Sequence, residues 1–332
     1  MNPIFFKDST AGHVFMAATD KYGRFGHNTL NLLSAFMLAH ILDGSFIPSP
    51  YSFYCHKWNS IVDWKFSQRA FTQGRGVISN YLSIASDQHY HGLKSTFDLN
   101  CTSGVGALLG TINALPNSLE GLQLIELPFD QLPGLLWSAN DSIRADFRSC
   151  INNLHIHNRE IDYACIHVRR GDVNASNHSS WFIEDIVYTN VIRIIKEISC
   201  MPIIIVTQPN SNGTIPFQGL SDEFPNLTVR VADSTWTSDQ EIDDFLIMMN
   251  ARILIGGKSS FCQVAHYGSS IQKTLYSLLK QEGPNFLPTR MTTKINIEND
   301  AWRKSLRASL EKDISGSFGI DNYRHNANTI NS

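Results

Sequence analysis

Three short apolar runs and one run of alternating apolar and polar residues are interspersed with amphipathic segments between residues 163 and 261, and this pattern constrains the fold more than any other feature. Apolar runs of this length are typical of buried strands, and apolar residues at helical spacing predict helices that cover them. Repeated alternation of strand and helix predicts an α/β fold with a parallel, doubly wound sheet and right-handed crossovers. The expected strands are residues 163–168, 202–206, 227–231 and 252–255, and the expected helices are residues 181–198 and 238–249.

The first of these runs ends in a group of charged residues. Residues 163–168 are followed directly by Arg169 and Arg170, and then by Gly171 and Asp172. In open α/β sheets, ligands bind just beyond the carboxyl ends of the strands, and Gly171 supplies the turn at which the chain leaves the sheet. A guanidinium forks onto phosphate oxygens and stays charged, so the two arginines predict an anion site. The alternative is a solvated strand end that pairs with surface acids.

Length and net charge restrict the kind of ligand. A chain of 332 residues exceeds the roughly 250 to 300 residues at which single cores stop growing, so two domains are expected. The formal net charge of −3 gives no general attraction to nucleic acid or anionic lipid, so a phosphate site has to be local. A small phosphorylated ligand is therefore expected, with no nucleic-acid partner.

The cysteines and the N-terminus indicate neither a metal site nor export. The six cysteines have no CxxC or metal-ligand spacing. The chain has no basic start followed by a long apolar run, and no stretch of about 18 apolar residues. These features predict a cytoplasmic protein without an integral membrane segment.

The first half of the chain is less regular. An expected strand at residues 13–18 precedes a turn-rich stretch at 20–26 and a helix at 28–42, a unit whose helix N-terminus can receive an anion or a sugar hydroxyl. Short strands at 45–48 and 123–127 and a helix at 138–154 follow. His89 and His91 lie close together, but no third ligand stands at a metal-site spacing.

The junction after the last predicted strand is rich in glycine and serine. Gly256 and Gly257 allow backbone to approach a ligand closely, and Ser259 and Ser260 offer hydroxyls and amides at the start of the next helix. This junction is similar to a phosphate cradle, although it lacks the pattern of a Walker loop.

Three blocks resemble the GDP-fucose-dependent fucosyltransferases, the group containing the α1,2-, α1,6- and protein O-fucosyltransferases, and the pattern is closest to the α1,2 enzymes. Residues 23–28 are similar to the N-terminal Gly-x-x-Gly-Asn-Gln block, with His27 and Asn28 in place of Asn and Gln. Residues 167–172 match the first motif closely. Asp244, followed fifteen positions later by Ser259, resembles the motif that pairs an acid with a Ser-Ser-Phe turn.

The resemblance implies a GT-B-like architecture, in which two Rossmann-like domains face a cleft. The expected parts are an acceptor-side α/β domain at 1–155, a GDP-sugar-binding domain at 156–285 and a helical tail at 286–332 that packs back on the first domain. Arg170 is expected to hold the β-phosphate with support from Arg169, and His167 and Asp244 to bind the guanine, with Asp243 able to replace Asp244. The other residues expected to bind the donor are Ser259, Ser260, Phe261, Gly26 and Asn28.

The implied reaction is inverting transfer of L-fucose from GDP-β-L-fucose to a hydroxyl of a glycan acceptor. Arg170 is expected to stabilise charge on the leaving diphosphate. No Asp-x-Asp motif ends a predicted strand, so neither a metal nor another cofactor is expected. His27 is the expected base, with Asp20 and Asp172 as rivals. Two alternatives stay open: a transferase for another GDP-sugar, and a catalytically silent protein that binds the nucleotide sugar.

Overall fold

The computed structural model describes residues 4–8, 12–16, 25–26, 29–30, 33, 36–37, 40, 45–47, 125–126, 141–150, 162–210, 212–214, 216–217, 219–232, 238–272, 274–280 and 292–315. The chain divides into two compact units. Unit 1 comprises residues 1–157, 263–270 and 283–290, and unit 2 comprises residues 158–262, 271–282 and 291–332.

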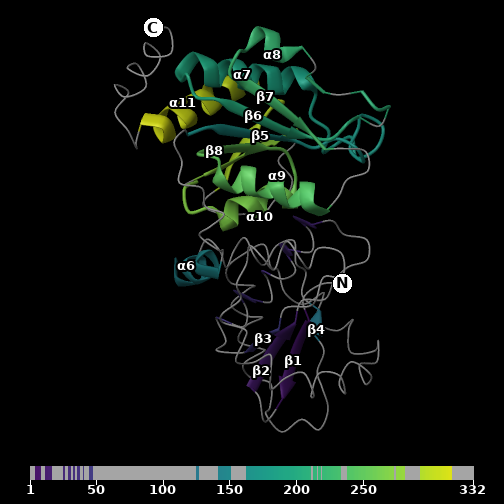
Figure 1. Ribbon diagram of the computed structural model, residues 1–332, viewed down its shortest axis with the longest axis vertical. Helices are drawn as coiled ribbons and strands as arrows, with labels where there is room; N and C mark the ends of the chain where they lie inside the picture. The colour runs from purple at the N-terminus through teal and green to yellow at the C-terminus, as the bar shows by residue number, and fades with distance from the viewer. Residues whose placement is uncertain are drawn as a thin grey trace. The chain divides into compact units, whose positions relative to one another are not determined.

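A six-stranded sheet forms the centre of unit 2, and its paired strands are parallel (Figure 1). The strand order is β10-β9-β8-β5-β6-β7. The chain starts in the middle and moves outward through β6 and β7, then returns to the other side of β5 and moves outward again. The strands are β5 (Ala164–Val168), β6 (Ile203–Thr207), β7 (Leu227–Val231), β8 (Ile253–Gly256), β9 (Leu275–Leu279) and β10 (Thr292–Asn296). This order is that of a doubly wound sheet, which confirms the predicted α/β class.

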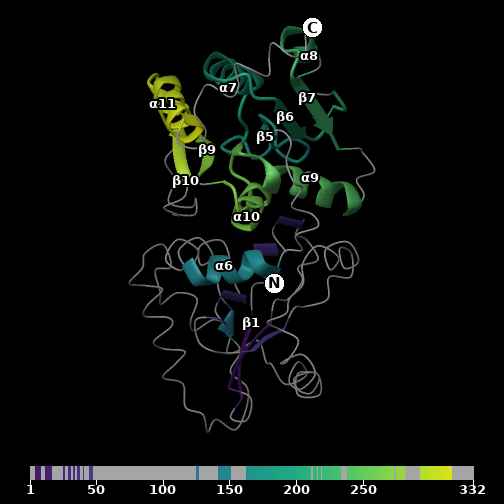
Figure 2. The same cartoon turned by 60° about the vertical axis from the view of Figure 1, so that its left-hand side comes forward.

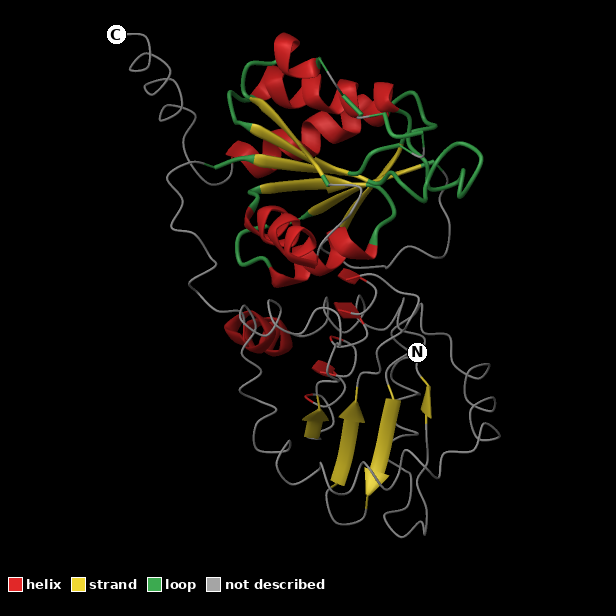
Figure 3. Ribbon diagram, turned by 45° about the vertical axis from the view of Figure 1, so that its right-hand side comes forward, coloured by secondary structure: helices red, strands yellow, loops and turns green. Residues whose placement is uncertain are grey.

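Helices cover both faces of this sheet. On one face lie α7 (Asp185–Ile198), α8 (Leu220–Glu223) and α11 (Trp302–Ser315), and α9 (Ser238–Asn250) lies against the opposite face (Figures 1 and 3). The first turn of α10 (Ser260–Gly268) is on the same side as α9, and the residues of α10 from Gln263 onward are grouped with unit 1. The predicted helices at 181–198 and 238–249 are confirmed, although α7 begins at Asp185.

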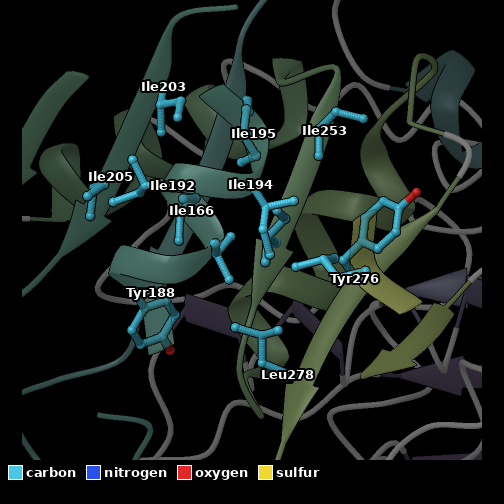
Figure 4. Close-up of a cluster of buried hydrophobic side chains, with 14 of the residues drawn as sticks. Ile166, Tyr188, Ile192, Ile194, Ile195, Ile203, Ile205, Ile253, Tyr276 and Leu278 are labelled. Carbon is cyan, nitrogen blue, oxygen red and sulfur yellow. The ribbon is translucent and has the colours of Figure 1, made fainter. Parts of the chain in front are cut away.

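The α7 side of the sheet is closed by branched apolar side chains (Figure 4). Because side chains alternate along a strand, Ile166 of β5 and Ile205 of β6 point toward this side, where they pack with Ile192 and Ile195 of α7. All four are almost fully buried. Burial of each such side chain contributes roughly 1.5 to 3 kcal/mol, so this face supplies much of the stability of unit 2.

The C-terminal helix belongs to the same apolar core. Trp302, Leu306 and Leu310 of α11 are buried in the cluster on the α7 side, and Arg307 of α11 pairs with Glu197 of α7 at 2.7 Å. Figure 2 shows α11 beside β9 and β10. The tail was expected to pack back on the N-terminal domain, and α11 instead packs within unit 2 because its apolar stripe faces α7.

Unit 1 contains a four-stranded sheet of mixed direction, in the order β3-β2-β1-β4. The strand β1 (Ile4–Asp8) is antiparallel to β2 (Gly12–Met16) and to β4 (Ile125–Glu126), and β2 is parallel to β3 (Ser45–Ile47). The strands expected at 13–18, 45–48 and 123–127 are thus confirmed, and β1 is an addition to the prediction.

The described residues between 25 and 40 are helical, as expected for residues 28–42. The helix already includes Phe25 and Gly26, so Gly26 lies in the helix and not in the preceding turn. The Thr29 hydroxyl donates a hydrogen bond to the Phe25 carbonyl at 2.7 Å, one turn back. The ring centres of Phe36 in this segment and Phe147 are 6.1 Å apart. Phe147 belongs to α6 (Asp141–Cys150), the described part of the helix expected at 138–154.

Candidate functional site

The strand order of unit 2 reverses between β5 and β8, which are hydrogen-bonded neighbours. The connections that follow these two strands leave toward opposite faces of the sheet, and doubly wound sheets bind ligands at the opening this creates. Arg169 follows β5, and Gly257 and Lys258 follow β8. Nη1 of Arg169 donates a hydrogen bond of 3.3 Å to the Lys258 carbonyl, so one guanidinium joins the two junctions.

Arg169 lies at the surface of this junction, with 28% of its side chain exposed. Its Nη2 donates to Asp172 Oδ2 at 3.1 Å. Its Cζ lies 5.0 Å from the centre of the Trp181 ring, and Nζ of Lys258 lies 4.8 Å from the same centre. Two positive charges therefore gather around one indole at the carboxyl ends of β5 and β8, a setting that favours an anion.

Arg170 lies in the interior, where only 1% of its side chain is exposed. Its Nη1 donates to the Arg169 carbonyl at 2.9 Å, and its Nη2 donates to the Ile183 carbonyl at 2.9 Å and to Asp185 Oδ1. The guanidinium also stacks over Phe182, with 4.7 Å between Cζ and the ring centre. From the sequence, this side chain was expected to hold the β-phosphate of the donor. In the structure the side chain is buried instead. A buried charge is stable only when it is paired, and Asp185 and two carbonyls accept the hydrogen bonds of this guanidinium.

The turn after the arginines has the glycine that its backbone requires. Gly171 has φ +74°, and a Cβ at this position would lie 2.9 Å from Oε1 of Gln208. Other residues avoid this left-handed region, so the predicted role of Gly171 as the turn residue is confirmed.

The two glycines after β8 make room for protein side chains. A Cβ on Gly256 would lie 2.6 Å from Sγ of Cys262, and a Cβ on Gly257 would lie 3.0 Å from Cδ1 of Ile183. The sequence assigned these glycines to close approach of a ligand. In the structure the tight contact is with Cys262 and Ile183, so packing of the junction already explains why glycine stands here.

Ser259 and Ser260 lie where the junction meets α10. Ser259 is buried, and Ser260 is the first residue of α10. The first amides of a helix have no partner within the helix and point along its axis. The structure thus brings these serines, Phe261 and Arg169 to the same end of the sheet.

His167 points to the face of the sheet opposite to α7. Its ring makes an edge contact with Phe261, at 5.8 Å between ring centres, and Phe261 in turn lies 6.5 Å from Phe245 of α9. Burial, with a smaller contribution from the charge of Arg169, lowers the pKa of His167 to about 3. The imidazole is therefore neutral at physiological pH. Its Nδ1 is buried and has no hydrogen-bond partner among the residues that the structure describes.

Asp244 is buried in α9 on the same side of the sheet as His167. Its Oδ1 accepts a hydrogen bond of 3.1 Å from Nε of Arg230 in β7, and 4% of the Asp244 side chain is exposed against 39% for Arg230. Burial raises the pKa of Asp244, the hydrogen bond and charge of Arg230 oppose this rise, and Asp243 adds to it, which gives a pKa of about 6. A buried carboxylate that stays ionised at neutral pH can accept hydrogen bonds from a ligand.

Some predicted residues lie outside the described part of the chain. These are His27, Asn28 and Asp20, together with His89 and His91. Gly26 is described, and it is buried and helical. For these N-terminal residues the roles stay predictions from sequence.

Four residues of this region were missed by the sequence interpretation: Trp181, Lys258, Asp185 and Arg230. Trp181 and Lys258 could have been found from their nearness in sequence to the arginines and to the Ser-Ser-Phe turn. Asp185 and Arg230 had no local signal, because each contacts its partner through the fold, at separations of 15 and 14 residues.

Comparisons with known proteins give similar solved structures only. No family model and no curated protein matches the chain. A crystal structure of NodZ alpha-1,6-fucosyltransferase co-crystallized with GDP is 14% identical, with a TM-score of 0.43 over 76% of this chain and 91% of the other. A structure of the same enzyme soaked with GDP-fucose is 13% identical in sequence, with a TM-score of 0.41 over 77% of this chain and 92% of the other. The crystal structure of Se-Met fucosyltransferase NodZ from Bradyrhizobium is 13% identical in sequence, with a TM-score of 0.38. That match covers 76% of this chain and 90% of the other. These scores are low, so the description of the fold rests on the strand order itself.

The described residues contain no helix that is long and apolar enough to cross a membrane. They also contain no group of three or more His, Cys, Asp or Glu residues arranged to hold a metal ion.

Proposed function

We propose that this chain is a glycosyltransferase that moves L-fucose from GDP-β-L-fucose to a hydroxyl of a glycan acceptor with inversion. The observation that carries the proposal is the guanidinium of Arg169, which joins the ends of β5 and β8 where the strand order reverses. Doubly wound sheets bind nucleotides at such a point. The sequence blocks at 167–172 and 244–261, which resemble GDP-fucose-dependent enzymes, belong to the elements that surround it.

The proposal assigns the diphosphate to Arg169 and not to Arg170. Arg169 is partly exposed and its bond to the Lys258 carbonyl is long, so its guanidinium can turn toward an anion. Arg170 has its acceptors within the protein and would have to leave Asp185 to bind a phosphate. Ser259, Ser260 and the first amides of α10 complete the expected diphosphate pocket.

The guanine is assigned to the α9 side of β5. Guanine presents N1–H and N2–H₂ as donors, and the buried carboxylate of Asp244 supplies matching acceptors. The neutral imidazole of His167 lies on the same face, and its unpaired Nδ1 is the kind of buried polar atom that a ligand satisfies. Phe261 beside it offers an aromatic wall.

The chemistry of such a transfer depends on charge. As the bond to the sugar breaks, the fucosyl group gains oxocarbenium character and negative charge grows on the β-phosphate. A preorganised guanidinium stabilises this charge more in the transition state than in the ground state. Among the rival bases, Asp172 is paired with Arg169 at 3.1 Å. His27 is proposed as the base in preference to Asp20, because an imidazole can exchange a proton near neutral pH.

Transfer assays test the proposal. Turnover is measured with GDP-fucose and with other GDP-sugars, each at saturation, against a panel of glycan acceptors. Fucosyl transfer that exceeds transfer of every other sugar supports the proposal. Preference for another GDP-sugar would identify a related transferase, and tight donor binding without transfer to any glycan would indicate a silent nucleotide-sugar-binding protein.

A further inference from the structure

The ion pair between Arg230 and Asp244 joins a half-exposed cation to a buried carboxylate. The exposed fractions of the two side chains are 39% and 4%, and the bond from Nε to Oδ1 is 3.1 Å long. Arg230 stands on β7, at the outer edge of the sheet, and Asp244 stands on α9. The cation therefore reaches the carboxylate from solvent, while the carboxylate itself is enclosed by protein.

The geometry leaves the carboxylate able to bind a ligand. Among the described residues, Arg230 is the only hydrogen-bond donor to Asp244, and it uses Oδ1 alone. Each carboxylate oxygen can accept two hydrogen bonds. Oδ2 and the second lone pair of Oδ1 thus remain open to the donors of a ligand.

The groups around Asp244 act on its charge in opposite directions. Burial, with a smaller contribution from neighbouring Asp243 on α9, raises its pKa, the bond and charge of Arg230 lower it, and the net result is a pKa of about 6. The pKa of the Cys165 thiol in β5 is raised mainly by burial, and the negative charge of Asp244 contributes to this rise. Within this set of described neighbours, Arg230 is the one cation that favours the ionised form of Asp244.

We infer that Arg230 is a positioning residue for guanine recognition, which holds the Asp244 carboxylate ionised and in one orientation. The inference rests on the proposed function, because it takes Asp244 as the group that binds guanine. Ionisation is essential to that role: a carboxylate accepts from both N1–H and N2–H₂, whereas a protonated carboxyl presents a donor of its own to these donors. Loss of the Arg230 charge therefore weakens guanine binding near neutral pH without removing any atom that touches the base.

The experiment measures the dissociation constant of GDP-fucose between pH 5 and 8.5, without acceptor. GDP-fucose is preferred to GDP because its diphosphate is esterified at both ends and lacks the secondary phosphate ionisation near pH 6. The variants are Arg230→Gln, which keeps a donor but no charge, and Arg230→Lys, which keeps the charge. Asp244→Asn is the control without a titrating group. His167 does not interfere, because its pKa of about 3 lies below the range.

The parent is expected to lose affinity as the pH falls through about 6, where Asp244 takes up a proton. Arg230→Gln is expected to bind roughly three- to tenfold more weakly than the parent at pH 7, since each unit of pKa corresponds to a factor of ten, and to approach the parent at pH 8.5. Arg230→Lys is expected to restore most of the affinity at pH 7. Asp244→Asn is expected to bind weakly at every pH in the range.

A second measurement follows Asp244 in the unliganded protein, by NMR of ¹³C-labelled aspartate. Arg230→Gln is expected to raise the pKa of Asp244, with or without a nucleotide. An unchanged pKa overturns the inference, and so does a loss of GDP-fucose affinity that is the same at all pH values, since that pattern indicates a structural or direct contact.

If the parent binds GDP-fucose and Arg230→Gln has the parental pH profile, the inference fails while the proposed function stands. If the parent binds no GDP-fucose, the proposed function fails, and the inference fails as well because it depends on that function.

Discussion

The two faces of the unit 2 sheet are built differently. On the α7 side, Ile166, Ile205 and Ile195 close the interface with branched apolar side chains. On the α9 side, the same sheet buries His167 and Asp244. Burial of such polar groups is unfavourable unless they are paired, so a face that carries them is less suited to stability and better suited to binding. The α7 side is thus closed by apolar packing, whereas the α9 side carries the buried polar groups that the proposed function assigns to a ligand.

Two adjacent arginines have different surroundings. Arg170 turns toward the α7 side, where it contacts Ile183 and Tyr188, with 5.7 Å between its Cζ and the centre of the Tyr188 ring. Arg169 stays at the open junction between β5 and β8. The same kind of side chain is therefore buried and paired at one position and partly exposed at the open junction at the next.

The largest expected effect is that of Arg169→Lys on turnover. Lysine keeps the charge but loses the two-pronged geometry that fits a diphosphate, so kcat is expected to fall roughly 10² to 10³-fold, as when one preorganised donor to a developing anion is removed. Initial rates with saturating GDP-fucose measure the effect. The matched control is Arg193→Lys, which changes an exposed arginine of α7 paired with Glu223 and is expected to keep parental rates. Parental turnover by Arg169→Lys would assign the phosphate to another residue.

Arg170→Ala is expected to act on stability. Its removal leaves two carbonyls and Asp185 without their donor. The expected loss in the free energy of unfolding is about 2 to 3 kcal/mol, less than for a fully buried pair, because half of the Asp185 side chain is exposed. Urea denaturation measures it.

The control for Arg170→Ala is the same substitution at the neighbouring Arg169, measured as a change in the free energy of unfolding. Arg169→Ala is expected to cost less than about 1 kcal/mol, as for other partly exposed ion pairs. A folded and stable Arg170→Lys variant whose kcat falls 10² to 10³-fold would return the catalytic role to Arg170, as the sequence first suggested.

His167 is expected to make the protein sensitive to acid. Its pKa is about 3 in the folded state and near 6.5 in the unfolded chain. The unfolded state therefore binds the extra proton first, and the contribution of His167 to stability falls as the pH falls from about 6.5 toward 3.

The test compares the parent with His167→Gln at pH 7 and pH 5. From pH 7 to pH 5 the parent is expected to lose about 1 to 2 kcal/mol more of its free energy of unfolding than the variant. Asp244 acts in the opposite direction, because its raised pKa lowers stability as the pH rises from about 4 to about 6. Its effect is common to both proteins and cancels in the comparison. Equal losses in both proteins would mean that His167 does not titrate as described.

The smallest expected effect is that of removing metal ions. The sequence has no Asp-x-Asp motif at the end of a predicted strand, so donor binding and transfer are expected to be unchanged in EDTA. Initial rates with and without EDTA measure this. A loss of transfer that Mg²⁺ or Mn²⁺ restores would replace the metal-independent mechanism.

The sequence predicted the strands that lie in the middle of the sheet better than those at its far edge. Residues 163–168 and 202–206 are apolar apart from His167, because both faces of β5 and β6 are covered. The edge strand β10 has the sequence TTKIN, in which only Ile295 is buried. Such a segment has little apolar signal, and the prediction missed it. The prediction also missed β9, although its sequence LYSLL is buried throughout.

The sequence indicated which residues lie near the ends of β5 and β8, but not how each of them is paired or buried. The motif at 167–172 correctly indicated a strand end rich in cations. Which arginine is buried depends on Asp185 and Ile183, which the following loop brings back to Arg170. The partner of Asp244 was likewise invisible, because Arg230 reaches it from another strand. Contacts of this kind depend on tertiary packing, which residue patterns along the chain do not encode in a readable way.

A crystal structure with GDP tests the central claim most directly. The account predicts the diphosphate within hydrogen-bond distance of Arg169 and of the first amides of α10, with the guanine edge on the Asp244 carboxylate and Arg170 still paired with Asp185. A diphosphate held by Arg170 after release of Asp185, or a nucleotide bound away from the ends of β5 and β8, would contradict it.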